Sequence, residues 1–199
     1  MAPHIALVLL VMLLAAVKAA IADDWPGATV KGVASQNAET IVRVIPGASI
    51  GDTYGFAGAS KGKFASAQWF RFRENRYELY QTTQLVNPVA PIHVAVANDG
   101  TVITLDNWHN VGFGDVVAIY SPDGKLRKKY RLGDLYSTAT IEKIDRSVSS
   151  IWWRCLRGDP HIERNNTLQV DDTLGGRFTF HLENGAYTYE AGIGGGCKP

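Results

Sequence analysis

The residues best suited to chemistry lie together in the middle of the chain. Asp106, Asn107, Trp108, His109 and Asp115 occur in one short stretch. A carboxylate near an imidazole can orient a general base or supply two ligands of a metal site. Asp and Asn also stabilise turns by bonding their own backbone, so a structural role is the alternative. We take these five residues as candidate ligand-binding residues and assign no catalytic residue and no metal ligand.

Few other patterns point to catalysis. Three more histidines could join His109 at a transition metal, although their spacing does not require it: His93, His161 and His181. The sequence contains no Gly-rich phosphate loop before a helix, no Gly-x-Ser-x-Gly elbow, no paired Cys-x-x-Cys and no His-Glu-x-x-His. We therefore expect no cofactor.

Aromatic residues are concentrated on one expected hairpin. They are Trp69, Phe70, Phe72, Tyr77 and Tyr80. Successive residues of a strand face opposite sides, so both faces of this hairpin carry aromatic rings. One face could remain open and stack on a sugar or on a partner's side chains. The alternative is that a second sheet covers both faces.

The elements that would position these residues are β-strands. From Phe64 onward apolar residues recur with a period of two, which is typical of strands. Six stretches follow the pattern: Gln68–Arg73, Tyr77–Thr83, His93–Val96, Thr101–Leu105, Val116–Tyr120 and Lys125–Leu132. Asp99-Gly100 is a strong hairpin signal, and Pro122 with Gly124 suits a type I turn. Residues 92–132 are therefore predicted to form four consecutive antiparallel strands.

This stretch resembles one blade of the NHL class of β-propeller repeats. The resemblance covers residues 92–132 and rests on three runs: Ile92–Gly100, Val102–Asp106 and Val117–Leu126. It implies the inner, middle and outer strands of one sheet, and a role as a binding platform. No second full copy follows, and a closed propeller needs about four blades. The chain is also similar to exported bacterial proteins that carry an Asp-Asn-Trp-His stretch, which implies no function.

The C-terminal half continues the β pattern. Residues 135–145 could form a short helix or a linker, and Ser149–Cys155 is predicted to be a buried strand. A last group of strands covers 167–170, 176–182 and 186–189, with Asn184-Gly185 as a favoured hairpin turn. The predicted fold class is all-β, with antiparallel meanders forming a sandwich or a short propeller-like stack.

The N-terminus has the pattern of a secretory signal peptide over residues 1–22. An apolar run from Ile5 to Ala16 precedes Ala20-Ile21-Ala22, which predicts cleavage before Asp23. The run is too short for a stable membrane span, although an uncleaved anchor is the alternative. We expect an irregular lead-in over 23–62 with one strand at 40–45, then a β domain over 63–199. The expected location is secreted or periplasmic.

Charge and cysteine content narrow the function classes. Lys and Arg number 20 and Asp and Glu number 19, so the chain lacks the positive field that nucleic acid requires. Cys155 and Cys197 are the two cysteines, and in an exported chain they are expected to form a disulfide.

The sequence favours an exported, non-enzymatic binding or interaction domain whose partner is a protein or a carbohydrate. One alternative is a metal-dependent or acid/base hydrolase centred on His109 and Asp106. The other is a structural component of the cell envelope without a small ligand.

Overall fold

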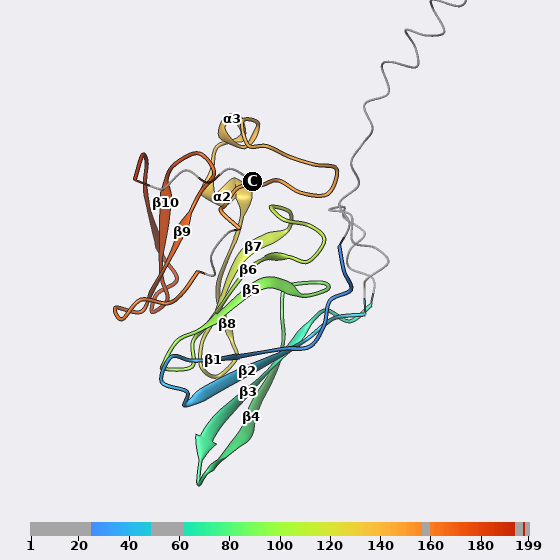
Figure 1. The fold of residues 1–199 in the computed structure, drawn as a ribbon, viewed down its shortest axis with the longest axis vertical. Helices are drawn as coiled ribbons and strands as arrows, with labels where there is room; N and C mark the ends of the chain where they lie inside the picture. The colour runs from blue at the N-terminus through green and yellow to red at the C-terminus, as the bar shows by residue number, and fades with distance from the viewer. Residues whose placement is uncertain (1–24, 49–61, 157–159, 194–196, 198–199) are drawn as a thin grey trace, which may run out of the picture.

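The computed structural model describes residues 25–48, 62–156, 160–193 and 197, and the expected signal peptide lies outside this range. The strands of the described chain form three antiparallel sheets (Figure 1), which confirms the all-β fold class. The two helices in these ranges are single turns, α2 (Leu132–Leu135) and α3 (Thr138–Ile141). Helix α2 ends where the segment expected to be a short helix or a linker begins, and α3 lies within that segment. No helix in these ranges is long and apolar enough to cross a membrane.

The first sheet contains four strands in sequence order: β1 (Lys31–Ala34), β2 (Thr40–Ile45), β3 (Ser66–Arg73) and β4 (Arg76–Gln84). The strand expected at 40–45 and the expected hairpin that follows residue 64 are confirmed. Strand β1 was not predicted, because it is short and mostly exposed and therefore lacks an alternating apolar pattern. The expected lead-in thus contributes two strands to the same sheet as β3 and β4.

The second sheet is the predicted four-stranded meander: β5 (Pro91–Val96), β6 (Val102–Asn107), β7 (Asp115–Tyr120) and β8 (Leu126–Arg131). All neighbouring strands pair antiparallel, so the four consecutive strands are confirmed. Such meanders occur in many β folds, and the resemblance to an NHL blade therefore stays a prediction.

The third sheet is also a meander, with β10 (Arg177–His181) between β9 (Thr167–Asp171) and β11 (Tyr187–Glu190). The chain therefore completes each sheet before it starts the next. In Figure 1, β9 and β10 lie to the left of the second sheet, and the first sheet lies below it.

The second sheet is the middle layer of a stack. All six residues of β6 are buried. On one face, Val102 and Tyr120 pack with Trp69 of the first sheet. On the other face, Ile103 packs in a cluster with Phe178 of the third sheet. Each fully buried aliphatic or aromatic side chain contributes about 1.5–3 kcal/mol to folding, so these two interfaces hold the layers together.

The predicted strand at Ser149–Cys155 is wrong, although its burial was predicted correctly. Trp153 is completely buried, but the segment makes only isolated bridges, one between Ile151 and Arg146 and one between Arg154 and Asp172. The segment crosses between the layers. Side-chain hydrogen bonds to Asp106, and not a strand ladder, fix its position.

The predicted disulfide is confirmed. Cys155 and Cys197 are bonded, with their Cα atoms 5.5 Å apart and a sequence separation of 42. The bond joins the crossing segment to the C-terminal end of the chain.

Candidate functional site

Asp106, in strand β6, connects the predicted loop site to the protein interior. Its carboxylate is completely buried. Oδ1 accepts hydrogen bonds from the backbone N–H of Gly112 (3.0 Å) and from the indole Nε1 of Trp153 (2.7 Å). Oδ2 accepts from Nε of Arg154 at 2.5 Å, in an ion pair that is itself buried. Both oxygens are therefore used to attach the loop and the crossing segment to the end of β6.

Gly112 is required where the loop meets the crossing segment. Its φ of +76° favours glycine, and an added Cβ would lie 2.6 Å from the carbonyl oxygen of Ile151. Ile151 also donates its N–H to the carbonyl of Val111 at 2.9 Å. The loop and the segment are thus in direct backbone contact.

Asn107 and Asp115 brace the two ends of the same loop. The Asn107 side chain donates to the backbone carbonyl of Asp115 (3.2 Å) and accepts from Nδ2 of Asn87 (2.8 Å). The Asp115 carboxylate forms an ion pair with Nζ of Lys129 at 2.9 Å. Both predicted site residues therefore have structural partners within the protein.

Trp108 and His109 lie together in a separate aromatic cluster with Trp25. The ring centroids of Trp25 lie 5.5 Å from Trp108 and 5.9 Å from His109, and Trp108 donates its indole N–H to the carbonyl of Pro26. Burial lowers the pKa of His109, so its imidazole is neutral at pH 7. No hydrogen bond or ion pair joins His109 to Asp106 in the described chain. The contact with Trp25 had no signal in the sequence.

Metal-ligating side chains are not clustered in the part of the chain that the structure describes. Within the ranges that the structure describes, no group of three or more His, Cys, Asp or Glu residues could hold a metal ion. His93 forms a hydrogen bond with the carbonyl of Pro160 at 2.8 Å, and His161 lies 3.0 Å from a Glu163 oxygen. These histidines are therefore engaged elsewhere.

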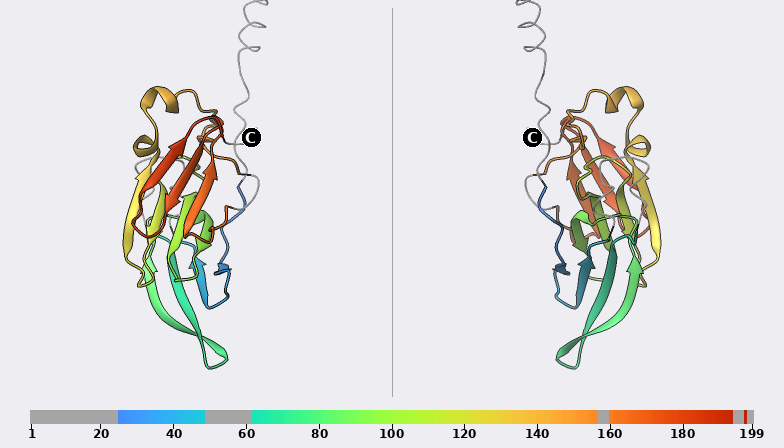
Figure 2. Two further views of the ribbon diagram at one scale, coloured as in Figure 1. Left: turned by 90° about the vertical axis from the view of Figure 1, so that its left-hand side faces the viewer. Right: turned by 90° about the vertical axis from the view of Figure 1, so that its right-hand side faces the viewer.

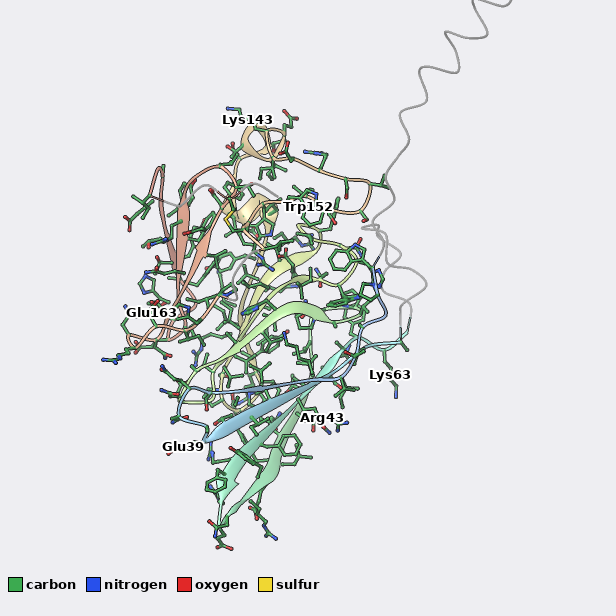
Figure 3. All side chains as sticks on the ribbon, viewed as in Figure 1. Glu39, Arg43, Lys63, Lys143, Trp152 and Glu163 are labelled. Carbon is green, nitrogen blue, oxygen red and sulfur yellow. A yellow bond between two sulfur atoms is a disulfide. The ribbon has the colours of Figure 1, made fainter. Side chains whose placement is uncertain are left out.

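A groove of about 670 Å³ runs along one edge of the stack, and sequence reasoning missed it. Its walls come from three distant parts of the chain: strand β1, strand β5 with the turn after it, and residues 160–166 before β9. Figure 3 labels Glu163, which belongs to the third wall. Strands β1 and β5 are each the outermost strand of their sheet, so two strand edges border the groove.

The groove has no dominant charge. Lys31 and Arg164 line it together with Asp99 and Glu163, so positive and negative groups balance among the described lining residues. A strongly charged ligand would find as much repulsion as attraction there. The lining favours a ligand that is neutral overall and carries hydrogen-bonding groups.

The expected aromatic hairpin is covered on one face and open on the other. Trp69 is completely buried against the second sheet and donates its indole N–H to the carbonyl of Gly100 at 3.1 Å. On the opposite face Phe72, Tyr77 and Leu79 are 46%, 39% and 51% exposed, and the rings of Phe72 and Tyr77 are 5.2 Å apart. Figure 2 shows this hairpin projecting from the lower end of the stack.

No protein-family model matches the chain, and no curated protein matches it either.

A second buried carboxylate stabilises the third sheet. Asp172 follows β9, and its Oδ1 accepts from the backbone N–H groups of Leu174 (3.0 Å) and Gly176 (2.6 Å). Its Oδ2 accepts from the hydroxyls of Tyr136 (2.8 Å) and Tyr189 (2.9 Å). This carboxylate thus ties the turn between β9 and β10 to the segment after α2.

The Tyr136→Phe variant should be less stable than the wild type by about 1.5–3 kcal/mol at pH 7, because it removes one hydrogen bond to a charged acceptor. Burial, and then Asp172, raise the pKa of Tyr136 far above its usual value of 10.0. Folding thus favours the neutral phenol, and its contribution is complete below about pH 10 and lost as the pH rises further. Urea unfolding from pH 7 to 11 should show a smaller alkaline loss of stability in the variant. An equal loss in both proteins would contradict this assignment.

Proposed function

We propose that this chain is an exported, non-enzymatic binding domain whose ligand occupies the groove bordered by β1, β5 and residues 160–166. The observation that carries this proposal is that three parts of the chain, far apart in sequence, form one concavity large enough for a small ligand or a segment of another molecule. The balanced charges of its lining support a ligand that is neutral overall.

Two features support export. The N-terminal sequence has the three parts of a secretory signal. The disulfide between Cys155 and Cys197 is of the kind that persists in oxidising compartments outside the cytoplasm.

The hydrolase alternative centred on His109 and Asp106 has less support. A general base needs a free lone pair directed at a reacting proton. The carboxylate of Asp106 is instead buried against Arg154 and Trp153. His109 lies among aromatic rings rather than beside that carboxylate.

A bulky side chain at Gly32, on the β1 wall of the groove, should weaken binding. Gly32 lines the groove, and an added Cβ there would meet no atom within 4 Å. The Gly32→Trp variant should therefore fold normally and lose affinity at least about tenfold, which corresponds to about 1.4 kcal/mol. The measurement is binding of the purified mature chain to arrays of immobilised peptides and oligosaccharides, followed by titration of each hit.

Gly133→Trp is the matched control. Gly133 lies in α2, away from the groove, and an added Cβ there also meets no atom within 4 Å. This variant should bind like the wild type. If Gly32→Trp also binds like the wild type, the ligand site lies elsewhere and the proposal is wrong.

A further inference from the structure

The edge of β5 that borders the groove presents backbone groups that have no strand partner. The N–H of Ala97 donates to the carbonyl of Thr101 at 2.8 Å, which fixes the hydrogen-bonding phase of the β5–β6 pair. In an antiparallel pair the residues alternate between bonding the neighbour and pointing away from it. Ala95 therefore bonds with β6, while Val94 and Val96 direct their N–H and C=O groups away from β6 and toward the groove.

The same alternation applies to β1. The N–H of Ser35 donates to the carbonyl of Thr40 at 2.8 Å, so Val33 bonds with β2 in the regular phase. Gly32 and Ala34 consequently direct their backbone groups away from β2. Among the described residues, both strand edges at the groove thus carry hydrogen-bonding groups without a strand partner.

These groups on β5 are buried, and the described residues provide no backbone partner for them. Val94 is 3% exposed and Val96 is 6% exposed. Among the described residues, no backbone hydrogen bond outside the strand ladders involves either residue. Buried backbone N–H and C=O groups are almost always paired in proteins. The buried edge of β5 can therefore accept a further strand.

We infer that an extended segment of another polypeptide binds in the groove as an additional strand on the free edge of β5. The inference rests on the proposed function and names the ligand class of the same site. A peptide backbone supplies the alternating donors and acceptors that Val94 and Val96 need. Strand β5 has six residues, which limits the paired segment to about 20 Å of extended chain.

The lining favours a peptide over a carbohydrate. Sugars commonly stack on aromatic rings, and the described lining residues include no Phe, Tyr or Trp. The mixture of Lys31, Arg164, Asp99 and Glu163 also suits a peptide of balanced charge. A second copy of this chain is a further source of such a strand, and the experiment separates it from other sequences.

The test begins with selection of a random phage-displayed peptide library on the mature, disulfide-bonded chain. Each selected peptide is synthesised with single N-methyl groups along its backbone, because N-methylation removes one N–H donor at a time. Addition to one strand edge uses the N–H of every second residue. N-methylation should therefore reduce affinity at least about tenfold at alternate positions and have little effect at the positions between them.

A pair of variants tests the edge itself. Val96→Pro removes both the valine side chain and the N–H that faces the groove, whereas the control Val96→Ala removes only the side chain beyond Cβ. Proline is tolerated at an edge strand when its nitrogen faces outward. Peptide affinity should fall at least about tenfold further in Val96→Pro than in Val96→Ala.

Hydrogen exchange keeps the test decisive if Val96→Pro does not fold. In the wild-type chain, the bound peptide should slow exchange at the amides of Val94 and Val96, with a smaller change at Ala95, which already bonds with β6. Equal or absent protection at these amides would overturn the inference.

The remaining outcomes separate the two proposals. If an oligosaccharide binds and Gly32→Trp abolishes this binding, the proposed function stands and strand addition is wrong. The same conclusion follows if N-methylation of a bound peptide has no alternating effect on its affinity. If the chain dimerises and Val96→Pro prevents dimerisation, the strand comes from a second copy rather than from another protein. If neither library yields a ligand sensitive to Gly32→Trp, both proposals fail.

Discussion

The Asp106→Ala variant should lose about 3–5 kcal/mol of unfolding free energy, the range found when one member of a buried ion pair is removed. Arg154 would be left as a buried cation without its carboxylate. The indole N–H of Trp153 and the N–H of Gly112 would lose their acceptor at the same time. Because a small domain is stable by about 5–15 kcal/mol, this single change would remove a large part of the total. Urea unfolding followed by tryptophan fluorescence measures it.

A double-mutant cycle shows whether the pair itself is responsible. Asp106→Asn keeps the size of the side chain and an acceptor oxygen but places no negative charge opposite Arg154. Combining it with Arg154→Met should cost less than the sum of the two single losses, with a coupling of about 0.5–3 kcal/mol. Strict additivity would mean that Asp106 acts through Trp153 and Gly112 and not through Arg154.

Replacing both cysteines by serine should lower the free energy of unfolding by about 4 kcal/mol. The disulfide closes a long loop, with a sequence separation of 42, and the estimate follows from the chain entropy that such a bond removes from the unfolded state. The C-terminal end near Cys197 would also lose its covalent attachment to the crossing segment.

Comparing the oxidised and reduced wild type with the Cys155→Ser/Cys197→Ser variant separates the bond from the substitutions. The reduced wild type and the double variant should unfold at the same urea concentration, well below that of the oxidised protein. If all three unfold together, the bond contributes nothing to the stability of the three layers.

The strands and hairpins could be predicted because their information is local. Phe70 and Phe72 lie two residues apart on β3, with Trp69 on the opposite face, which is the period of a strand. Asp99-Gly100 suits the tight turn that joins β5 to β6. The four strands of the second sheet were predicted as one unit for this reason. The near-continuous apolar sequence of β5, β6 and β7 is explained by burial on both faces.

The crossing segment and β1 could not be assigned correctly from local pattern. Ser149–Cys155 is apolar because it is buried, but its backbone does not pair in a ladder, and composition alone does not distinguish these two cases. Strand β1 contains Gly32 and is mostly exposed, so it shows neither an apolar face nor β-branched enrichment.

The separate roles of the residues in the predicted loop site could not be inferred from the sequence. Asp106 points inward because Arg154, 48 residues later, provides its partner. Nothing near Asp106 in the sequence indicates that pairing. The groove was missed for a similar reason: its walls come from three separate parts of the chain, and its most informative groups are backbone atoms of Val94 and Val96, which no side-chain motif describes.

The completion of each meander before the next begins has a consequence for folding during synthesis. Every strand pair joins neighbours in sequence, so a nascent chain can form its sheets one at a time from the N-terminus. The inner face of the first sheet, which includes Val42 and Trp69, then stays exposed to water until the second sheet has been synthesised. That interval, in which hydrophobic surface is briefly uncovered, is the stage at which aggregation would compete most strongly with folding.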